Sequence, residues 1–168
     1  DFRVPGVTSM SADLHKYGYA AKGASVVLYR GPELRKFQFF VTTSWPGGIY
    51  ASPALAGTRP GGAMAAAWAV MNYLGEEGYC RIVDTMMRTA GQMRAGIDAI
   101  PGRRVLGAPD MCVMAIGGEG LDVYEVGDEM QGRGWHLDRQ QFPPSLHLTI
   151  TYGHAGVVEP FLADLRAS

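Results

Sequence analysis

The stretch that decides the fold, residues 9–29, reads SMSADLHKYGYAAKGASVVLY. This stretch reaches from one β-type run, Val7–Ala12, to the end of a second, Ala24–Tyr29, and the segment between the two runs is rich in glycine and aromatic residues. Lys16 comes soon after the first run and is preceded by His15. At the end of a strand in an apolar, glycine-rich setting, desolvation disfavours a lysine ammonium and leaves a nucleophilic amine for Schiff-base chemistry. Lys16 is therefore the candidate catalytic residue, although the spacing alone fits a solvated surface lysine better.

The composition is that of one globular domain and argues against several classes of function. Of 168 residues, 47% are hydrophobic and 18% charged, and the net charge of -1 lacks the basic excess of a dedicated nucleic-acid-binding protein. No apolar run reaches the ~20 residues that span a bilayer. Cys80 and Cys112 lack the spacing of a zinc module, and the three histidines at 136, 147 and 154 show no metal-ligand spacing. We expect no metal and no nucleic-acid partner.

Glycine and proline divide the chain into a loop-rich first part and a helical middle. So much glycine and proline in Trp45–Pro53 and Gly57–Gly62 predicts turns, because regular elements there would cost backbone entropy. Apolar positions at helical spacing then predict helices over Ala63–Leu74 and Tyr79–Ile100, separated near Gly75. The methionines on these helices are typical of core and subunit packing.

Beyond residue 100, short strands alternate with helices. This pattern predicts a small α+β layer in which helices cover one face of a sheet. We place a domain boundary near residue 100. The predicted elements are strands at Arg104–Leu106, Cys112–Ile116 and Leu146–Thr151, and helices at Asp122–Arg133 and Val157–Arg166.

Six stretches, in order along nearly the whole chain, carry a further set of motifs: Ser9–Tyr19, Lys22–Tyr29, Trp45–Pro53, Ala56–Gly62, Asn72–Tyr79 and Gly134–His147. Together they resemble the sphingosine-1-phosphate lyases. The His-Lys pair alone also marks the wider decarboxylase group, whereas ordered agreement over several motifs is specific. Ala21 stands where the family commonly has Pro, and Ala54 where it commonly has Thr, but the charged and hydroxyl groups stay in place.

The resemblance implies an α/β fold of the aspartate-aminotransferase type, fold type I. Residues 1–100 would form the end of the large pyridoxal-phosphate domain, with the Schiff-base lysine and the connecting helices. Residues 101–168 would form the small C-terminal α+β domain. The chain starts at Asp1 without an initiator Met, and the family's acid, stacking ring and phosphate loop lie upstream. We therefore expect a C-terminal portion that holds the lysine but only part of the pocket.

The resemblance also assigns roles to individual residues. Lys16 would form the Schiff base with the cofactor, pyridoxal 5'-phosphate, and His15 would lie near the cofactor phosphate. Lys22 would reach the phosphate of the substrate, a role that its point charge suits. Thr58, where the family usually has Ser, would offer its hydroxyl to the cofactor phosphate from a loop that crosses a homodimer interface. Arg59 is ambiguous, since it fits either a loop-holding role or a phosphate contact.

The implied reaction is retro-aldol cleavage of a phosphorylated sphingoid base into a fatty aldehyde and phosphoethanolamine. The expected location is the cytoplasm or a membrane face turned to the cytosol, and an upstream membrane anchor stays open. One alternative is an amino-acid decarboxylase of the same fold, which shares the His-Lys pair but not the patterns at Lys22 and residues 45–60. Another alternative is an inactive fragment that lacks the upstream half of the site.

Overall fold

The computed structural model describes all 168 residues, and the chain divides into two compact units, Asp1–Gly75 and Glu76–Ser168. Helix α2 (Gly61–Asp98) passes from the first unit into the second, and Gly75 interrupts it with φ 60° and ψ 179°. Only glycine adopts these angles without strain. The two predicted helices with a break near Gly75 are thus confirmed. The domain boundary near residue 100 stays a prediction.

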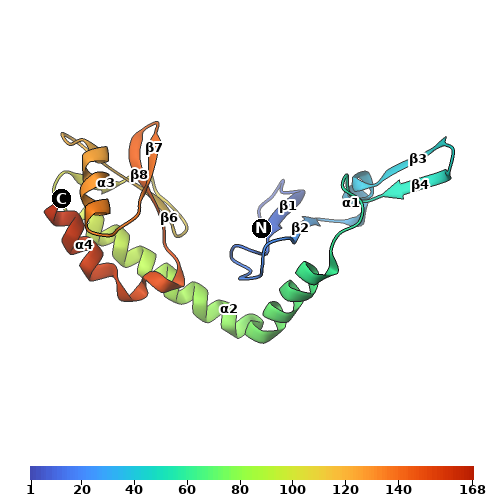
Figure 1. The fold of residues 1–168 in the computed structure, drawn as a ribbon, viewed down its shortest axis with the longest axis horizontal. Coiled ribbons are helices and arrows are strands. Elements are labelled where there is room, and N and C mark those ends of the chain that lie inside the picture. The colour runs from blue at the N-terminus through green and yellow to red at the C-terminus, as the bar shows by residue number, and fades with distance from the viewer. The chain divides into compact units, whose positions relative to one another are not determined.

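Unit 1 holds two separate hairpins (Figure 1). Strand β1 (Ser9–Asp13) pairs antiparallel with β2 (Ser25–Tyr29), which confirms both predicted strands. A short helix, α1 (Pro32–Arg35), and a 3-10 turn, η1 (Lys36–Gln38), follow. Lys16 lies in the segment that connects β1 to β2.

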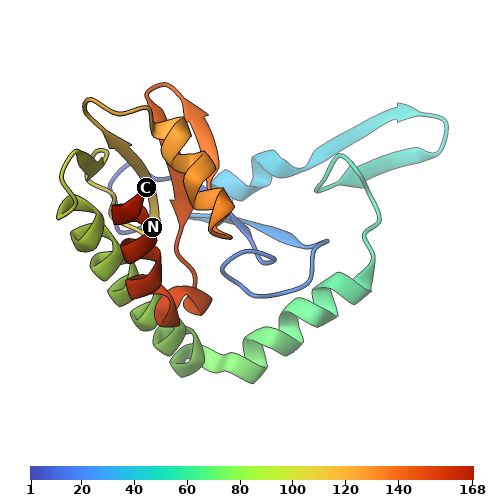
Figure 2. The same cartoon turned by 60° about the vertical axis from the view of Figure 1, so that its left-hand side comes forward.

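The second hairpin corrects the prediction of a loop over Trp45–Pro53. Strand β3 (Phe40–Trp45) pairs antiparallel with β4 (Gly48–Ser52), and the chain turns at Pro46 and Gly47 (Figure 2). Proline and glycine suit a tight turn, so they mark the tip of a hairpin here and not a long loop. The indole ring of Trp45 lies over Gly47, where a Cβ would collide with it.

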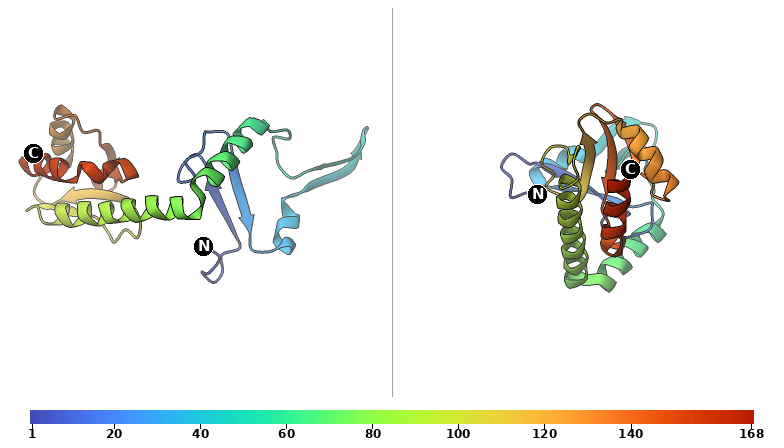
Figure 3. Two further views of the ribbon diagram at one scale, coloured as in Figure 1. Left: turned by 90° about the horizontal axis from the view of Figure 1, so that it is seen from below. Right: turned by 90° about the vertical axis from the view of Figure 1, so that its left-hand side faces the viewer.

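Unit 2 is a four-stranded antiparallel sheet with helices on one face. The strand order is β5-β6-β8-β7. Helix α4 lies beside the second half of α2 (Figures 1 and 3). The sheet and helices confirm the predicted α+β layer, but β7 was not predicted, because all four of its residues are polar and exposed. The elements are β5 (Arg103–Val105), β6 (Val113–Gly118), α3 (Val123–Gly132), β7 (Asp138–Gln141), β8 (Pro144–Thr149), η2 (Tyr152–Gly156) and α4 (Val158–Ala167).

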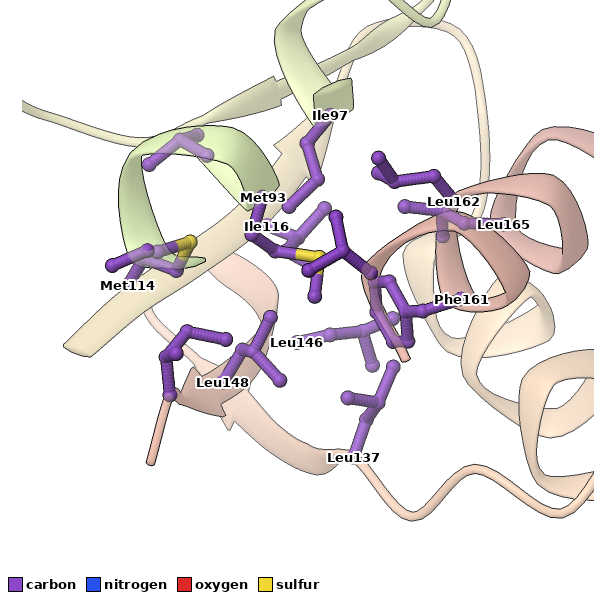
Figure 4. Packing of buried hydrophobic residues seen from close by; sticks show 14 of the residues in the cluster. Met93, Ile97, Met114, Ile116, Leu137, Leu146, Leu148, Phe161, Leu162 and Leu165 are labelled. Atoms are coloured by element: carbon purple, nitrogen blue, oxygen red, sulfur yellow. The ribbon is translucent and has the colours of Figure 1, made fainter. Parts of the chain in front are cut away.

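The hydrophobic core belongs to unit 2. Side chains from α2, the sheet and α4 interlock, among them Met93, Ile116 and Leu165 (Figure 4). In unit 1 only Ala20, Ser52 and Ala67 are buried. Helix α2 has 38 residues, yet neither it nor any other helix is apolar enough over its length to cross a membrane.

Candidate functional site

Lys16 lies in a tight turn that begins where β1 ends. Its backbone N–H donates to the Asp13 carbonyl at 3.0 Å, and the Tyr19 N–H donates to the Lys16 carbonyl at 3.1 Å. A Cβ on Gly18 would lie 2.5 Å from the Leu14 carbonyl oxygen, so the turn closes only with glycine there. Tyr19 has a positive φ of 55°, a conformation uncommon for residues other than glycine. The turn therefore fixes the backbone from which the Lys16 side chain starts.

The Lys16 side chain is paired with a carboxylate instead of being desolvated. Its Nζ lies 3.2 Å from Oδ2 of Asp13, and the Lys16 side chain is 65% exposed. The apolar setting expected for this lysine is therefore absent at its amino group. The Ser25 hydroxyl donates a 2.6 Å hydrogen bond to Oδ1 of Asp13. This hydrogen bond, together with the Lys16 ammonium, holds the pKa of the Asp13 carboxyl below its usual value.

A hollow of about 720 Å³ lies next to this turn and is lined by residues of unit 1 alone. His15 faces it, and the Nδ1 atom of His15 is buried without a hydrogen-bond partner. Arg59, from the segment before α2, lines the same hollow. The other lining residues are Leu14, Gly23, Ala24, Ser25, Val26, Met64, Ala67, Trp68 and Met71.

These residues fit a phosphate-bearing aromatic cofactor. A guanidinium and an imidazole are donors suited to phosphate oxygens, and both Arg59 and His15 line the hollow. A buried ring nitrogen without a partner costs free energy unless a ligand or water satisfies it. Trp68 and Met64 add an apolar wall that suits a planar ring. Lys16, next to His15 in the chain, is the nearby primary amine.

The structure brings together only some of the predicted site residues. His15 and Arg59 line one hollow, whereas Lys16, adjacent to His15 in the same turn, does not itself line it. Lys22 is exposed in the turn before β2, and Thr58 is exposed in the segment that leads to α2. Neither lines the hollow, although their neighbours Gly23 and Arg59 do. The roles assigned to these residues stay predictions.

Two polar residues of this site were not singled out from the sequence. Asp13 precedes Lys16 by three residues, a spacing that a turn can close into an ion pair, so the sequence did hold a signal for it. Ser25 is twelve residues from Asp13 and meets it only because the two residues are paired in the β1–β2 register. The register of a hairpin with a long connection cannot be read from the sequence.

Comparison with known proteins finds relatives that match the whole chain and share one name. No family model matches the chain. The chain is 49% identical to the sphingosine-1-phosphate lyase of Oryza sativa subsp. japonica over 168 residues, covering 100% of the chain and 31% of that protein. It is 50% identical to the lyase of Arabidopsis thaliana and 46% identical to sphingosine-1-phosphate lyase 1 of Rattus norvegicus, and covers 30% of each. The chain thus spans about 30% of the length of these relatives.

Solved structures agree with these relatives. The sphingosine-1-phosphate lyase of Burkholderia pseudomallei K96243 matches with a TM-score of 0.91 and 46% identity, over 98% of this chain and 38% of that one. A glutamate decarboxylase of Lactobacillus brevis matches with a TM-score of 0.77 at 18% identity, and this likeness shows the fold alone.

These likenesses confirm the fold class, which is that of fold type I pyridoxal-phosphate enzymes. They also confirm pyridoxal 5'-phosphate as the cofactor of the group that the chain resembles. Over its whole length, the chain is a homologue of the sphingosine-1-phosphate lyases.

Proposed function

We propose that the chain is the lysine-bearing part of a pyridoxal-phosphate-dependent aldehyde-lyase. Its substrate is a phosphorylated sphingoid base, sphingosine 1-phosphate, which it cleaves into a fatty aldehyde and phosphoethanolamine. One observation carries the proposal: the His15–Lys16 turn borders a hollow with phosphate donors, in a chain 49% identical over its length to a lyase of that name. The substrate and reaction come from that relative's name and family.

In this proposal the Nζ atom of Lys16 has two roles. This Nζ would hold pyridoxal 5'-phosphate covalently when the cofactor is bound, and the same Nζ, once free, would hold or carry a proton. Pyridoxal 5'-phosphate, when bound, supplies the electron sink for carbon–carbon cleavage. The turn that fixes the Lys16 backbone limits the region that Nζ can sample, which favours reaction at one place.

The phosphate groups have separate partners in the proposal. His15 and Thr58 hold the cofactor phosphate, and Lys22 holds the phosphate of the substrate. Thr58 lies in the segment before α2. In the proposal this segment reaches across a homodimer interface, and Thr58 binds the cofactor phosphate from there. The remaining site residues come from a part of the polypeptide upstream of Asp1, and the enzyme works in the cytosol or on a membrane face turned to it.

The test uses the longer lyase polypeptide that carries this chain. Lys16→Ala should abolish cleavage of sphingosine 1-phosphate, because it removes the covalent nucleophile and leaves no large cavity. Lys36→Ala is the matched control, since Lys36 lies in η1, outside the turn and the hollow. Near-normal cleavage in the Lys16 variant overturns the assignment.

Lys22 separates the lyase from the decarboxylase alternative. Lys22→Ala should damage cleavage of the phosphorylated substrate far more than cofactor binding, since a charge-assisted contact contributes about 1.5 to 3 kcal/mol. Equal loss of both points to a structural lysine. Decarboxylation of free amino acids without cleavage of sphingosine 1-phosphate favours the alternative enzyme of the same fold.

A further inference from the structure

We infer that Asp13 is a positioning residue for Lys16: oriented by Ser25, its carboxylate holds the Lys16 ammonium at the end of β1 until that amine reacts. The inference rests on the proposed function only in taking Lys16 as the reactive lysine. It assigns a role to two residues, Asp13 and Ser25, to which the proposed function gives none.

The two oxygens of the Asp13 carboxylate have different partners. Oδ1 accepts the 2.6 Å hydrogen bond from the Ser25 hydroxyl, and Oδ2 lies 3.2 Å from Nζ of Lys16. Asp13 and Ser25 are paired residues of the antiparallel strands β1 and β2. The position of the Lys16 Nζ therefore depends on both strands, because Asp13, on β1, is oriented by Ser25, on β2. It does not depend on the long lysine side chain alone.

The charges around Asp13 favour its ionised form. The Ser25 hydrogen bond, the Lys16 ammonium and the nearby His15 all lower the pKa of Asp13. The Lys16 ammonium is held in an ion pair with this carboxylate. Before Lys16 attacks an electrophile it must therefore leave Asp13. The pair restrains the amine and defines where it starts.

The lysine content of the chain makes this measurable. Lys16, Lys22 and Lys36 are its only lysines. Lys36 lies over the ring of Phe37 at 5.1 Å, in a segment away from Asp13, so it serves as an internal reference. The Asp1–Arg3 ion pair, in the same unit and also exposed, gives a matched control for the loss of a surface carboxylate.

The experiment is competitive acetylation of the lyase polypeptide, freed of cofactor, with trace isotopic acetic anhydride and peptide mapping at neutral pH. In Asp13→Asn, labelling of Lys16 relative to Lys36 should rise about two- to five-fold, the size typical of an exposed ion pair. Ser25→Ala should move the ratio in the same direction and Ser25→Thr, which keeps a hydroxyl, should restore it. Asp1→Asn should leave the ratio unchanged.

Two results overturn the inference. One is an unchanged ratio of Lys16 to Lys36 in both Asp13→Asn and Ser25→Ala. The other is an equal rise at all three lysines, which indicates general loosening, and hydrogen exchange across β1 and β2 detects the same loosening directly. Acetylation needs no cofactor, so it is independent of the proposed function. A changed ratio in a protein whose Lys16 never links to pyridoxal 5'-phosphate supports the positioning role and contradicts the function.

Discussion

The indole N–H of Trp135 donates a 2.8 Å hydrogen bond to Oδ2 of Asp164, which joins the segment after α3 to α4. The same indole meets the ring of Phe161 nearly at right angles, with centroids 5.2 Å apart. Both contacts are part-buried at the edge of the unit 2 core. Trp135 therefore fastens the segment that follows α3 to α4 by one polar and one apolar contact.

Replacing Trp135 by Phe should remove the hydrogen bond and keep an aromatic ring next to Phe161. We expect the free energy of unfolding of unit 2 to fall by about 1–2 kcal/mol, because the acceptor is a charged group left without its donor. Urea denaturation followed by circular dichroism measures this. Arg133→Gln is the control, since Arg133 is 3.4 Å from Asp164 at an exposed site and should cost under about 0.5 kcal/mol. A larger loss for Arg133 than for Trp135 contradicts the account.

Two glycines on α2 should respond in opposite ways to alanine. A Cβ on Gly96 would collide with the Leu162 side chain of α4, whereas a Cβ on Gly91 meets nothing within 4 Å. Gly96→Ala should therefore destabilise unit 2 by about 1–3 kcal/mol through overpacking. Gly91→Ala should stabilise it by about 0.5–1 kcal/mol through helix propensity. Thermal unfolding of both variants checks the pair, and a stabilising Gly96→Ala refutes the close packing of α4 on α2.

The Ser25 hydroxyl should control the titration of Asp13. The folded pKa of Asp13 is lowered, so the contacts of its carboxylate contribute to stability above the ordinary carboxyl pKa. That contribution is lost as the pH falls through the lowered value. Ser25→Ala should move the pKa of Asp13 back up, because the hydrogen bond from Ser25 is the largest cause of the shift. The carboxyl carbon shift of Asp13 against pH measures this, with Ser25→Thr as the conservative control. A pKa that stays low in Ser25→Ala excludes the serine as the main cause.

Hydrogen exchange should differ sharply between the two units. The core cluster begins at Met86, whereas Ala20, Ser52 and Ala67 are the only buried residues of unit 1. Backbone protection depends on such buried contacts. In the 168-residue chain, amides of β6 and β8 should exchange far more slowly than those of β1 and β2. Strong protection across β1 and β2 in a confirmed monomer contradicts this prediction.

Most of the fold could be predicted where hydrophobic periodicity is strong. The second half of α2, the strands β6 and β8, and α4 follow apolar patterns that match their burial. The first half of α2 was predicted as a helix from its apolar spacing, but Met64, Trp68 and Met71 on that face are exposed. Strand β7 could not be predicted, because it is an edge strand of four polar residues held by pairing with β8 alone. The hairpin β3–β4 was not predicted, because the glycine and proline content of this stretch indicated turns. The residues with high strand propensity on either side of the turn are Val41, Thr42, Ile49 and Tyr50.

The site was less predictable than the fold. Lys16 and His15 stood out because the motif around them resembles one family, whereas the position of a lysine shortly after a strand was a weak signal on its own. The partners of Lys16 depended on tertiary geometry, since Ser25 reaches Asp13 only through the register of two strands. The exposure of the Lys16 amino group, contrary to the apolar setting expected, also follows from side-chain direction and not from neighbouring sequence.

The most direct test of the account is the identity of the lysine that links to pyridoxal 5'-phosphate. The polypeptide that carries this chain is loaded with the cofactor, reduced with borohydride, digested and mapped by mass spectrometry. Lys16 should carry the reduced cofactor, while Lys22 and Lys36, the other two lysines of the chain, should stay unmodified. A cofactor found on Lys22 or Lys36, or equally on all three lysines, would contradict the account.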